Sequence, residues 1–188
     1  HGGRGLTSTI VAAEVEPTCH PLGKNNKLVF APGLLSGTTA ANSGRLSCGA
    51  KSPLTGTIKE ANAGGTSAQM LARLGVKAII IEGMPEGDTW YNLHLSEDSI
   101  TINEETELIG KGNFAVAEAV ENRFTKKTGV ITIGPAGEMK LAAANISVKD
   151  PDSKMRSNGR GGLGAVMGSK KLSSFPLPKQ PVMSKLPS

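Results

Sequence analysis

The sequence predicts an α+β domain in which strands outnumber helices and two similar halves face one ligand. Three observations support this prediction: short runs of β-branched residues that end at glycine or proline, only two segments with helical signals, and glycine loops that occur twice. Of the 188 residues, 38% are hydrophobic, so the chain is long enough to bury one core without disulfides or metals. We therefore expect one folded domain.

Four segments have the features of strands. Residues 28–30, 78–81 and 130–133 are apolar and end at turn signals, which predicts buried strands. Residues 90–95 alternate between apolar and polar side chains, which is typical of a half-exposed strand.

Two segments have helical signals. Residues 67–74 begin with a hydroxyl residue and end at Gly75, and residues 114–124 place apolar side chains at helical spacing before Gly129. Each predicted helix precedes a predicted strand, so the order of helix and strand occurs twice.

Glycine loops also occur in pairs. Residues 43–50 and 158–165 share their Gly-Arg and Gly-Ala spacing, and residues 81–85 loosely resemble residues 133–137. Short matches in a chain with 24 glycines also arise by chance. A true internal duplication would predict a pseudo-twofold platform that presents paired loops to a two-part ligand.

The composition changes after Leu172. Residues 173–181 contain three prolines, which remove backbone donors and prevent a regular helix. We expect residues 1–172 to form the domain and residues 173–188 to form a proline-rich tail outside the core.

The net charge narrows the class of partner. A net charge of +5 favours an anionic partner: nucleic acid, an acidic membrane surface or a phosphorylated small molecule. The longest apolar run, residues 78–81, is far shorter than the roughly 20 residues that span a bilayer, and no signal peptide opens the chain, so we expect a cytoplasmic protein.

Cys19 and Cys48 form no CxxC pair, which predicts buried thiols.

Two glycine loops are candidates for binding phosphate. Residues 61–65 lead into a predicted helix, whose free amides favour an anion, although an ordinary capped turn has the same pattern. Residues 156–164 place Arg156 and Arg160 among four glycines, where guanidinium groups and exposed backbone suit phosphate. The alternatives for this loop are a flexible basic segment or an RNA-binding tract, but it lacks the aromatic residues that usually accompany the latter.

Other site classes find less support in the sequence. The glycines of residues 159–164 have the spacing of a dinucleotide-binding loop, but no apolar strand precedes them and no acidic residue follows. The three histidines have no serine or cysteine partner at recognisable spacing, so no local pattern indicates a nucleophile or a general base.

Taken together, the loops resemble the N-terminal domain of the aldehyde:ferredoxin oxidoreductases over residues 1–172. The matching segments are residues 2–5, 21–22, 26–28, 31–33, 43–45, 51–56, 61–65, 80–83, 133–138 and 159–170. The sequences Lys-Ser-Pro-Leu-Thr-Gly and Gly-Ala-Val-Met-Gly-Ser-Lys are too long for their joint occurrence to be chance.

This resemblance implies an α+β platform of two β-sheets, related by a pseudo-twofold axis, that carries a tungsten or molybdenum bis-pterin cofactor. It implies that Arg45 bridges a pterin and a [4Fe-4S] cluster, and that the backbone carbonyls of Asn62 and Ser157 bind the magnesium ion that joins the two pterin phosphates. The cofactor-binding residues that it implies are Arg45, Asn62, Ala63, Gly64, Arg156, Ser157, Gly159 and Arg160.

The resemblance also implies an activity for the complete enzyme. An aldehyde or related oxo substrate would be oxidised at the metal, and electrons would pass through the iron–sulfur cluster to ferredoxin or a similar protein. The chain starts at a point after the family's first β-hairpin and lacks the cluster cysteines, so we expect the C-terminal domains as partners, besides a homo-oligomeric assembly, and neither nucleic acid nor a membrane. We expect this chain alone to be inactive; the alternatives are a truncated remnant that only binds pterin, and a basic nucleic-acid-binding domain.

Overall fold

A computed structural model describes residues 1–96 and 99–178, which form two β-sheets and a few short helices, as the sequence predicts. The first half contains α1 (Gly3–Glu14), β1 (Leu28–Pro32), β2 (Arg45–Lys51), β3 (Ile58–Gly64), α2 (Ser67–Arg73) and β4 (Ile79–Ile81). A hairpin of β5 (Tyr91–Leu95) and β6 (Ile100–Glu104) follows. The second half contains α3 (Asn113–Arg123), β7 (Gly129–Thr132), α4 (Gly134–Glu138), β8 (Ile146–Lys149), β9 (Met155–Asn158), α5 (Leu163–Ser169) and β10 (Leu172–Leu177).

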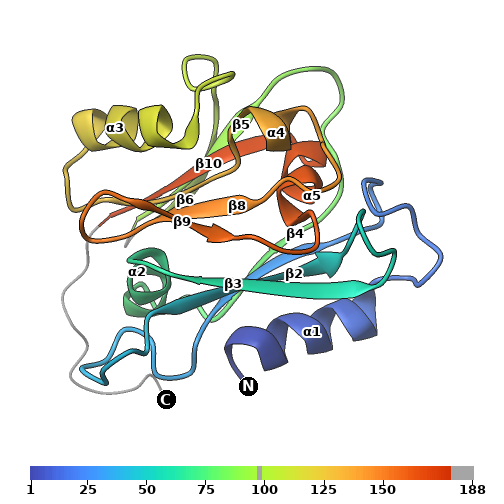
Figure 1. Cartoon of the computed structure of the whole chain (residues 1–188), viewed down its shortest axis with the longest axis horizontal. Helices are drawn as coiled ribbons and strands as arrows, with labels where there is room; N and C mark the ends of the chain where they lie inside the picture. The colour runs from blue at the N-terminus through green and yellow to red at the C-terminus, as the bar shows by residue number, and fades with distance from the viewer. Residues whose placement is uncertain (97–98, 179–188) are drawn as a thin grey trace.

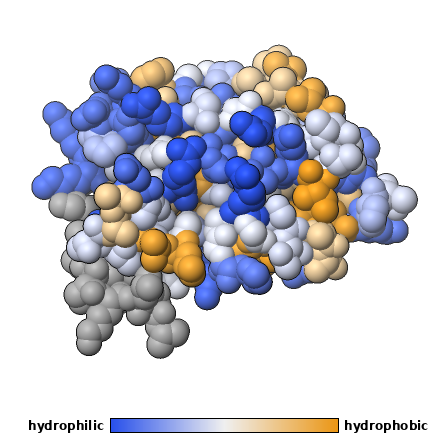
Figure 2. All heavy atoms as spheres, turned by 60° about the horizontal axis from the view of Figure 1, so that its bottom comes forward, coloured by the Kyte–Doolittle hydropathy of each residue, from blue (hydrophilic) through white to orange (hydrophobic). Residues whose placement is uncertain are grey.

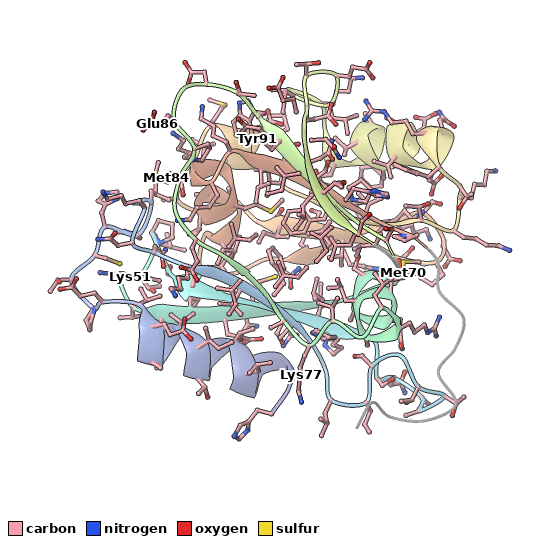
Figure 3. All side chains as sticks on the ribbon, turned by 180° about the vertical axis from the view of Figure 1, so that it is seen from behind. Lys51, Met70, Lys77, Met84, Glu86 and Tyr91 are labelled. Carbon is pink, nitrogen blue, oxygen red and sulfur yellow. The ribbon has the colours of Figure 1, made fainter. Side chains whose placement is uncertain are left out.

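The two sheets form the middle of a four-layer molecule (Figure 1). One sheet has the strand order β3-β2-β1-β4, and the other has the order β6-β5-β10-β7-β8-β9. Helix α1 covers the outer face of the first sheet and α3 covers that of the second, while α2 and α5 lie toward opposite ends (Figure 1). Behind this view, the segment from Lys77 past Met84 to Tyr91 connects the two sheets (Figure 3).

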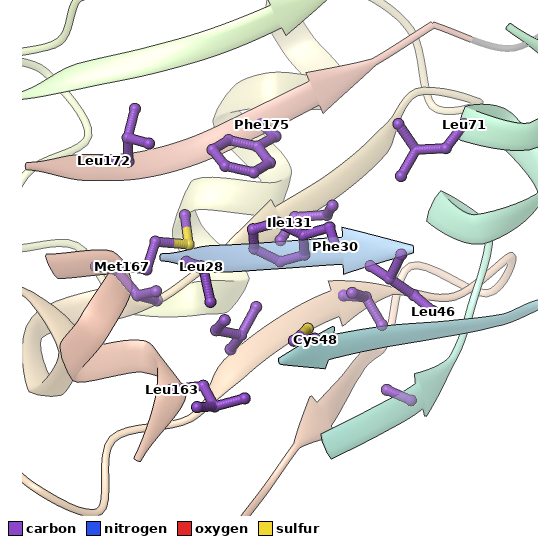
Figure 4. Close-up of a cluster of buried hydrophobic side chains, with 14 of the residues drawn as sticks. Leu28, Phe30, Leu46, Cys48, Leu71, Ile131, Leu163, Met167, Leu172 and Phe175 are labelled. Carbon is purple, nitrogen blue, oxygen red and sulfur yellow. The ribbon is translucent and has the colours of Figure 1, made fainter. Parts of the chain in front are cut away.

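The main core lies between the sheets (Figure 4). Phe30 of β1 and Phe175 of β10 meet edge to face with ring centroids 5.2 Å apart, and both rings are fully buried. Leu28, Met167 and Leu172 pack in the same cluster. Burying each such side chain contributes about 1.5–3 kcal/mol, so this layer supplies much of the folding free energy.

Each outer helix adds a smaller apolar cluster at the corresponding place. Val11 and Val15 of α1 pack on Val29 of β1, and Val116 and Val120 of α3 pack with Val130 of β7. The face that carries α1 has mainly hydrophilic residues across its middle and hydrophobic ones toward its margins (Figure 2).

The buried-thiol prediction is confirmed. Cys19 belongs to the α1 cluster and Cys48 to the main core, and neither forms a disulfide. Burial raises the pKa of the Cys48 thiol well above its usual value.

The order of elements supports the predicted pseudo-twofold relation. Strands β3-β2-β1-β4 occupy the same order as β9-β8-β7-β10, and the helices α1 and α2 occupy the same places in the chain as α3 and α5. The sequence comparison nevertheless paired the wrong loops. Residues 43–50 lead into and form β2, whereas residues 158–165 run from the end of β9 into α5, so their structural counterpart is the end of β3 and its connection to α2, residues 63–67.

All four predicted strands and both predicted helices are present, as β1, β4, β5 and β7 and as α2 and α3. Strand β4 is less buried than predicted, because it forms the edge of its sheet and leaves Ile80 39% exposed. Among the described helices, none has the length and the apolar character that crossing a membrane requires.

The prediction that the domain ends at Leu172 is wrong. Residues 172–177 form β10, whose side chains are all buried and which pairs with β7 through Phe175 and Ile131. Pro176 is tolerated because the pairing of β10 with β5 ends at Ser174, so only the β7 side needs a ladder there. Of the predicted tail, residues 179–188 lie outside the described residues.

Candidate functional site

The candidate site lies where the two sheets meet edge to edge. Strand β3 is an edge strand of the first sheet and β9 is an edge strand of the second, and the two pack side by side (Figure 1). A polar pocket of about 300 Å³ opens at this seam. Its lining residues are Arg4, Arg45, Glu60, Asn62, Ser157, Gly159 and Arg160.

The first half contributes Arg45 and Asn62. On β3, Ala61 and Ala63 point into the core, so the alternation of a strand directs Asn62 to the opposite face. The Arg45 guanidinium donates to Asn62 Oδ1 from Nε at 3.1 Å and from Nη2 at 2.7 Å. This pair of bonds fixes the guanidinium at the rim of the pocket.

The second half places a related pair at the corresponding position. Ser157 of β9 lies opposite Ser147 of β8, just as Asn62 lies opposite Ser47 of β2. Asn145, immediately before β8, donates from Nδ2 to Ser157 Oγ at 3.0 Å. The two hairpins therefore present side chains of the same ladder position to one pocket.

The loop after β9 brings in Arg160. Gly161 and Gly162 have φ values of +79° and +68°, a region that favours glycine. A Cβ atom at Gly162 would lie 1.8 Å from the carbonyl oxygen of Ala142, so no other residue fits without backbone movement. Ser52 Oγ, in the Lys-Ser-Pro-Leu-Thr-Gly segment, donates to the Gly161 carbonyl at 2.6 Å and ties this loop to the first half.

The structure brings together most of the residues that the sequence nominated. Arg45, Asn62, Ser157, Gly159 and Arg160 line the pocket, although more than 90 residues of chain separate Asn62 from Ser157. Ala63 instead packs in the core at 4% exposure. Gly64 ends β3 opposite Arg45 and is not part of the lining.

Arg156 points to another partner. Its Nε donates to Asp150 Oδ2 at 2.9 Å, and it does not line the pocket. Burial of Asp150 opposes ionisation, but backbone donors and Arg156 outweigh it, so the pKa of this carboxyl is lowered. Arg156 is thus engaged by a carboxylate that stays ionised at neutral pH.

Two lining residues were not predicted. Arg4 comes from the first turn of α1, and Glu60 precedes Asn62 by two residues on β3. Strand alternation was the available signal for Glu60, because residues 60 and 62 must share a face. No local signal placed Arg4, since α1 itself was not predicted.

The pocket suits an anion with several oxygens. It contains three guanidinium groups and one carboxylate, and guanidinium binds phosphate through paired hydrogen bonds. Within residues 1–96 and 99–178, no three His, Cys, Asp or Glu residues are grouped as metal ligands. The groups that this pocket offers are guanidinium cations, one carboxylate, amide and hydroxyl side chains, and backbone.

Comparison with known proteins matches this chain to one family. The family model described as aldehyde ferredoxin oxidoreductase, N-terminal domain, matches residues 1–175. The tungsten-containing aldehyde ferredoxin oxidoreductases of Thermococcus kodakarensis and Pyrococcus furiosus are each 37% identical to it over 175 residues. The matched part is 93% of this chain but 28% of each relative.

Two further matches are a relative of lower sequence identity and a protein of known structure. A protein of Pyrococcus furiosus described as the WOR-like subunit of an aliphatic sulfonate oxidoreductase is 29% identical over 201 residues, covering 95% of this chain and 31% of that protein. The active-site complex BamBC of benzoyl coenzyme A reductase, solved with 1,5-dienoyl-CoA, superposes with a TM-score of 0.87 at 32% identity. That match covers 95% of this chain and 26% of the other.

Proposed function

Because the chain belongs to the aldehyde ferredoxin oxidoreductase family, as its N-terminal domain, we propose that the pocket between β3 and β9 binds the phosphate groups of a tungsten or molybdenum bis-pterin cofactor. The convergence of Arg45 and Asn62 from one half with Ser157 and Arg160 from the other carries this proposal. Two similar hairpins that meet at one pocket suit a ligand made of two similar parts.

The residues present fit such a ligand. Arg45 and Arg160 supply charge and paired donors for phosphate oxygens, and the glycine backbone from Gly159 to Gly162 lets a ligand approach closely. When bound, the metal–pterin group would supply the redox chemistry; this chain's own residues bind and orient it.

Magnesium is the second part of the proposal. Asn62 and Ser157 lie on strands that form the outer edges of their sheets, where backbone groups on the outer side have no ladder partner. We propose that their carbonyl oxygens hold a magnesium ion between the two phosphate groups, since Mg²⁺ prefers hard oxygen ligands and usually binds through phosphates. Ala63 and Gly64, which follow Asn62 in the chain, would then contribute through their backbone and not through their side chains.

In the complete protein, this domain would serve an oxidoreductase that acts on an aldehyde or a related oxo substrate. Arg45, at the pocket rim, would lie between the cofactor and a [4Fe-4S] cluster through which electrons reach ferredoxin. The chain spans 28% of the length of its tungsten-containing relatives, so this activity is proposed for the larger protein. We propose that the 188-residue chain alone does not reduce a viologen dye with aldehyde, and sustained turnover would contradict this.

The binding proposal is tested by cofactor retention. The chain is purified from cells grown with tungstate, and the pterin released on denaturation is measured by fluorescence together with tungsten and magnesium. Replacing Arg45 and Arg160 by Ala should reduce retained pterin strongly, because charge-assisted hydrogen bonds contribute about 1.5–3 kcal/mol each, or about two to four decades in affinity together.

Arg156→Ala is the matched control, because it removes a guanidinium of the same segment that does not line the pocket. It should retain pterin at the wild-type level. Loss of pterin from the Arg156 variant, with full retention by the Arg45 and Arg160 double variant, would refute the assignment of the pocket.

A further inference from the structure

Two charged residues of the pocket have no part in the function proposed above. Arg4 Nε lies 3.1 Å from Glu60 Oε2, and the Glu60 side chain is only 11% exposed whereas that of Arg4 is 68% exposed. A nearly buried carboxylate in a pocket meant for an anion opposes binding by its charge. Its presence therefore needs a structural reason.

The second carboxylate oxygen of Glu60 supplies that reason. Glu60 Oε1 accepts a hydrogen bond from Asn62 Nδ2 at 2.8 Å, while Asn62 Oδ1 accepts both bonds from Arg45. An ionised carboxylate can only accept and a guanidinium can only donate. Glu60 and Arg45 thus force the Asn62 amide into a single orientation.

Helix α1 is held close enough to the sheet to complete this network. A Cβ atom at Gly49 of β2 would lie 2.7 Å from the Thr7 side chain, so only glycine permits this approach. Thr7 is fully buried at the contact, one turn after Arg4. The helix therefore delivers the Arg4 guanidinium to Glu60 at the pocket.

We propose that Glu60 is a positioning residue for the anion pocket and that Arg4 is its third anion-binding guanidinium, alongside Arg45 and Arg160. This rests on the proposed phosphate-binding function. Glu60 orients Asn62, Asn62 holds Arg45, and the ion pair keeps Arg4 at the rim while it uses only Nε. The remaining nitrogens of Arg4 can then donate to a phosphate group.

Pyrophosphate serves as the probe, in calorimetric titrations of the 188-residue chain at low salt. Glu60→Gln keeps an oxygen that accepts from Asn62. It removes a negative charge that opposes the anion and also the ion pair with Arg4, and because these two effects oppose each other, binding should stay close to that of the wild type. Glu60→Val removes the same charge but also the acceptor, so binding should weaken about tenfold. A purely electrostatic role would instead make both variants bind more tightly.

Arg4→Gln should weaken pyrophosphate binding about tenfold. Lys24→Gln is its control, since it removes one positive charge from an exposed residue outside the pocket. Equal affinities of these two variants would overturn the role of Arg4, and wild-type affinity in the Val variant would overturn that of Glu60. Glu60→Thr, which is also too short to reach Asn62, replaces the Val variant if that one does not fold.

A ligand-free measurement separates this proposal from the proposed function. Proton exchange at Arg45 Nε, followed by NMR, should stay slow in the wild type and in Glu60→Gln and become at least about tenfold faster in Glu60→Val. If the wild type does not bind pyrophosphate, the proposed function and the role of Arg4 both fail, while the exchange rates still decide the role of Glu60. Unchanged exchange in Glu60→Val would refute positioning even if pyrophosphate binds.

Discussion

The two halves of the molecule use the same order of elements in different surroundings. Strand β4 ends the first sheet and leaves Ile80 partly exposed, whereas its counterpart β10 lies inside the second sheet because the β5–β6 hairpin pairs with its other side. Equivalent strands of one architecture therefore differ in burial because of what is added beside them. The second half should accordingly depend more on its last strand than the first does.

The halves also divide the chemistry of the site unequally. Arg45 donates to Asn62 in the first half, and Asn145 donates to Ser157 at the same place in the second. The second half thus has the neutral Asn145 where the first half has the charged Arg45. Its own cation in the pocket, Arg160, comes from the loop after β9. The repeated hairpins therefore give the pocket its shape, and its charge comes from positions at which the two halves differ.

The largest expected effect tests the difference between β10 and β4. Phe175→Ala removes a fully buried ring between the two sheets and should lower the free energy of unfolding by about 3–5 kcal/mol. Ile80→Ala, at the exposed edge, should cost less than about 1 kcal/mol. Urea unfolding followed by circular dichroism measures both, and similar losses would mean that the two strands are equally important.

A smaller effect is expected at the loop that joins the halves. Gly162→Ala places a Cβ against the Ala142 carbonyl at a positive φ, which should cost about 2–3 kcal/mol. Gly64→Ala is the control, because a Cβ there meets nothing within 4 Å and φ is not positive. The same unfolding measurement applies, and a neutral Gly162 variant would show that the loop can move away.

The next prediction concerns a lysine that bridges the halves. Lys170, just after α5, is buried and donates from Nζ to the Gly23 and Asn26 carbonyls of the first half. Burial lowers the pKa of this amine from 10.5 to about 8. Between about pH 8 and 10.5 the unfolded chain therefore binds more protons than the folded chain, so the free energy of unfolding rises with pH. The full shift corresponds to about 3 kcal/mol, which solvent screening of this partly buried amine reduces to about 2 kcal/mol.

Lys170→Met should remove this rise. Stability is measured from pH 7.5 to 10.5 in both proteins, and the difference between the two curves cancels the contributions of other groups, such as the Cys48 thiol, which ionises in this range when the chain is unfolded. A difference that stays constant across this range would show that the Lys170 amine keeps its usual pKa in the folded chain.

Sequence patterns predicted the elements whose residue composition differs most from that of the flanking segments. The buried runs at β1 and β7 consist of apolar residues bounded by turn signals, and α2 and α3 end near glycines. Strand β2 was missed because its residues, Arg-Leu-Ser-Cys-Gly-Ala-Lys, have low strand propensity and are held by neighbours on both sides. Tertiary pairing, which local patterns do not encode, decides such a strand.

The same limit applies to β10 and to the site. The prolines near Phe175 predicted a tail, but a proline fits where the ladder continues on one side only. Resemblance to the family nominated Arg45, Asn62, Ser157 and Arg160, which line one pocket in the structure. It did not identify Glu60, whose role depends on the hydrogen bonds around one amide.

The smallest expected effect concerns a buried residue that differs between the halves. Asn158 lies opposite Ile146, where the first half has Ala63 opposite Leu46. Asn158 is fully buried, and neither side-chain polar atom has a hydrogen-bond partner among the described residues. Leaving such atoms unpaired costs about 1–3 kcal/mol.

Asn158→Ala should therefore stabilise the protein by about 1 kcal/mol, because removing two unpaired polar atoms outweighs the small cavity that remains. The reciprocal change, Ala63→Asn, should destabilise it by about 1–3 kcal/mol, since it introduces the same unpaired amide into the first half. Denaturant midpoints of both variants test the pair. A loss of stability in Asn158→Ala would mean that the amide has a partner in solution, and the two halves would then differ by a working polar contact and not by an unpaired one.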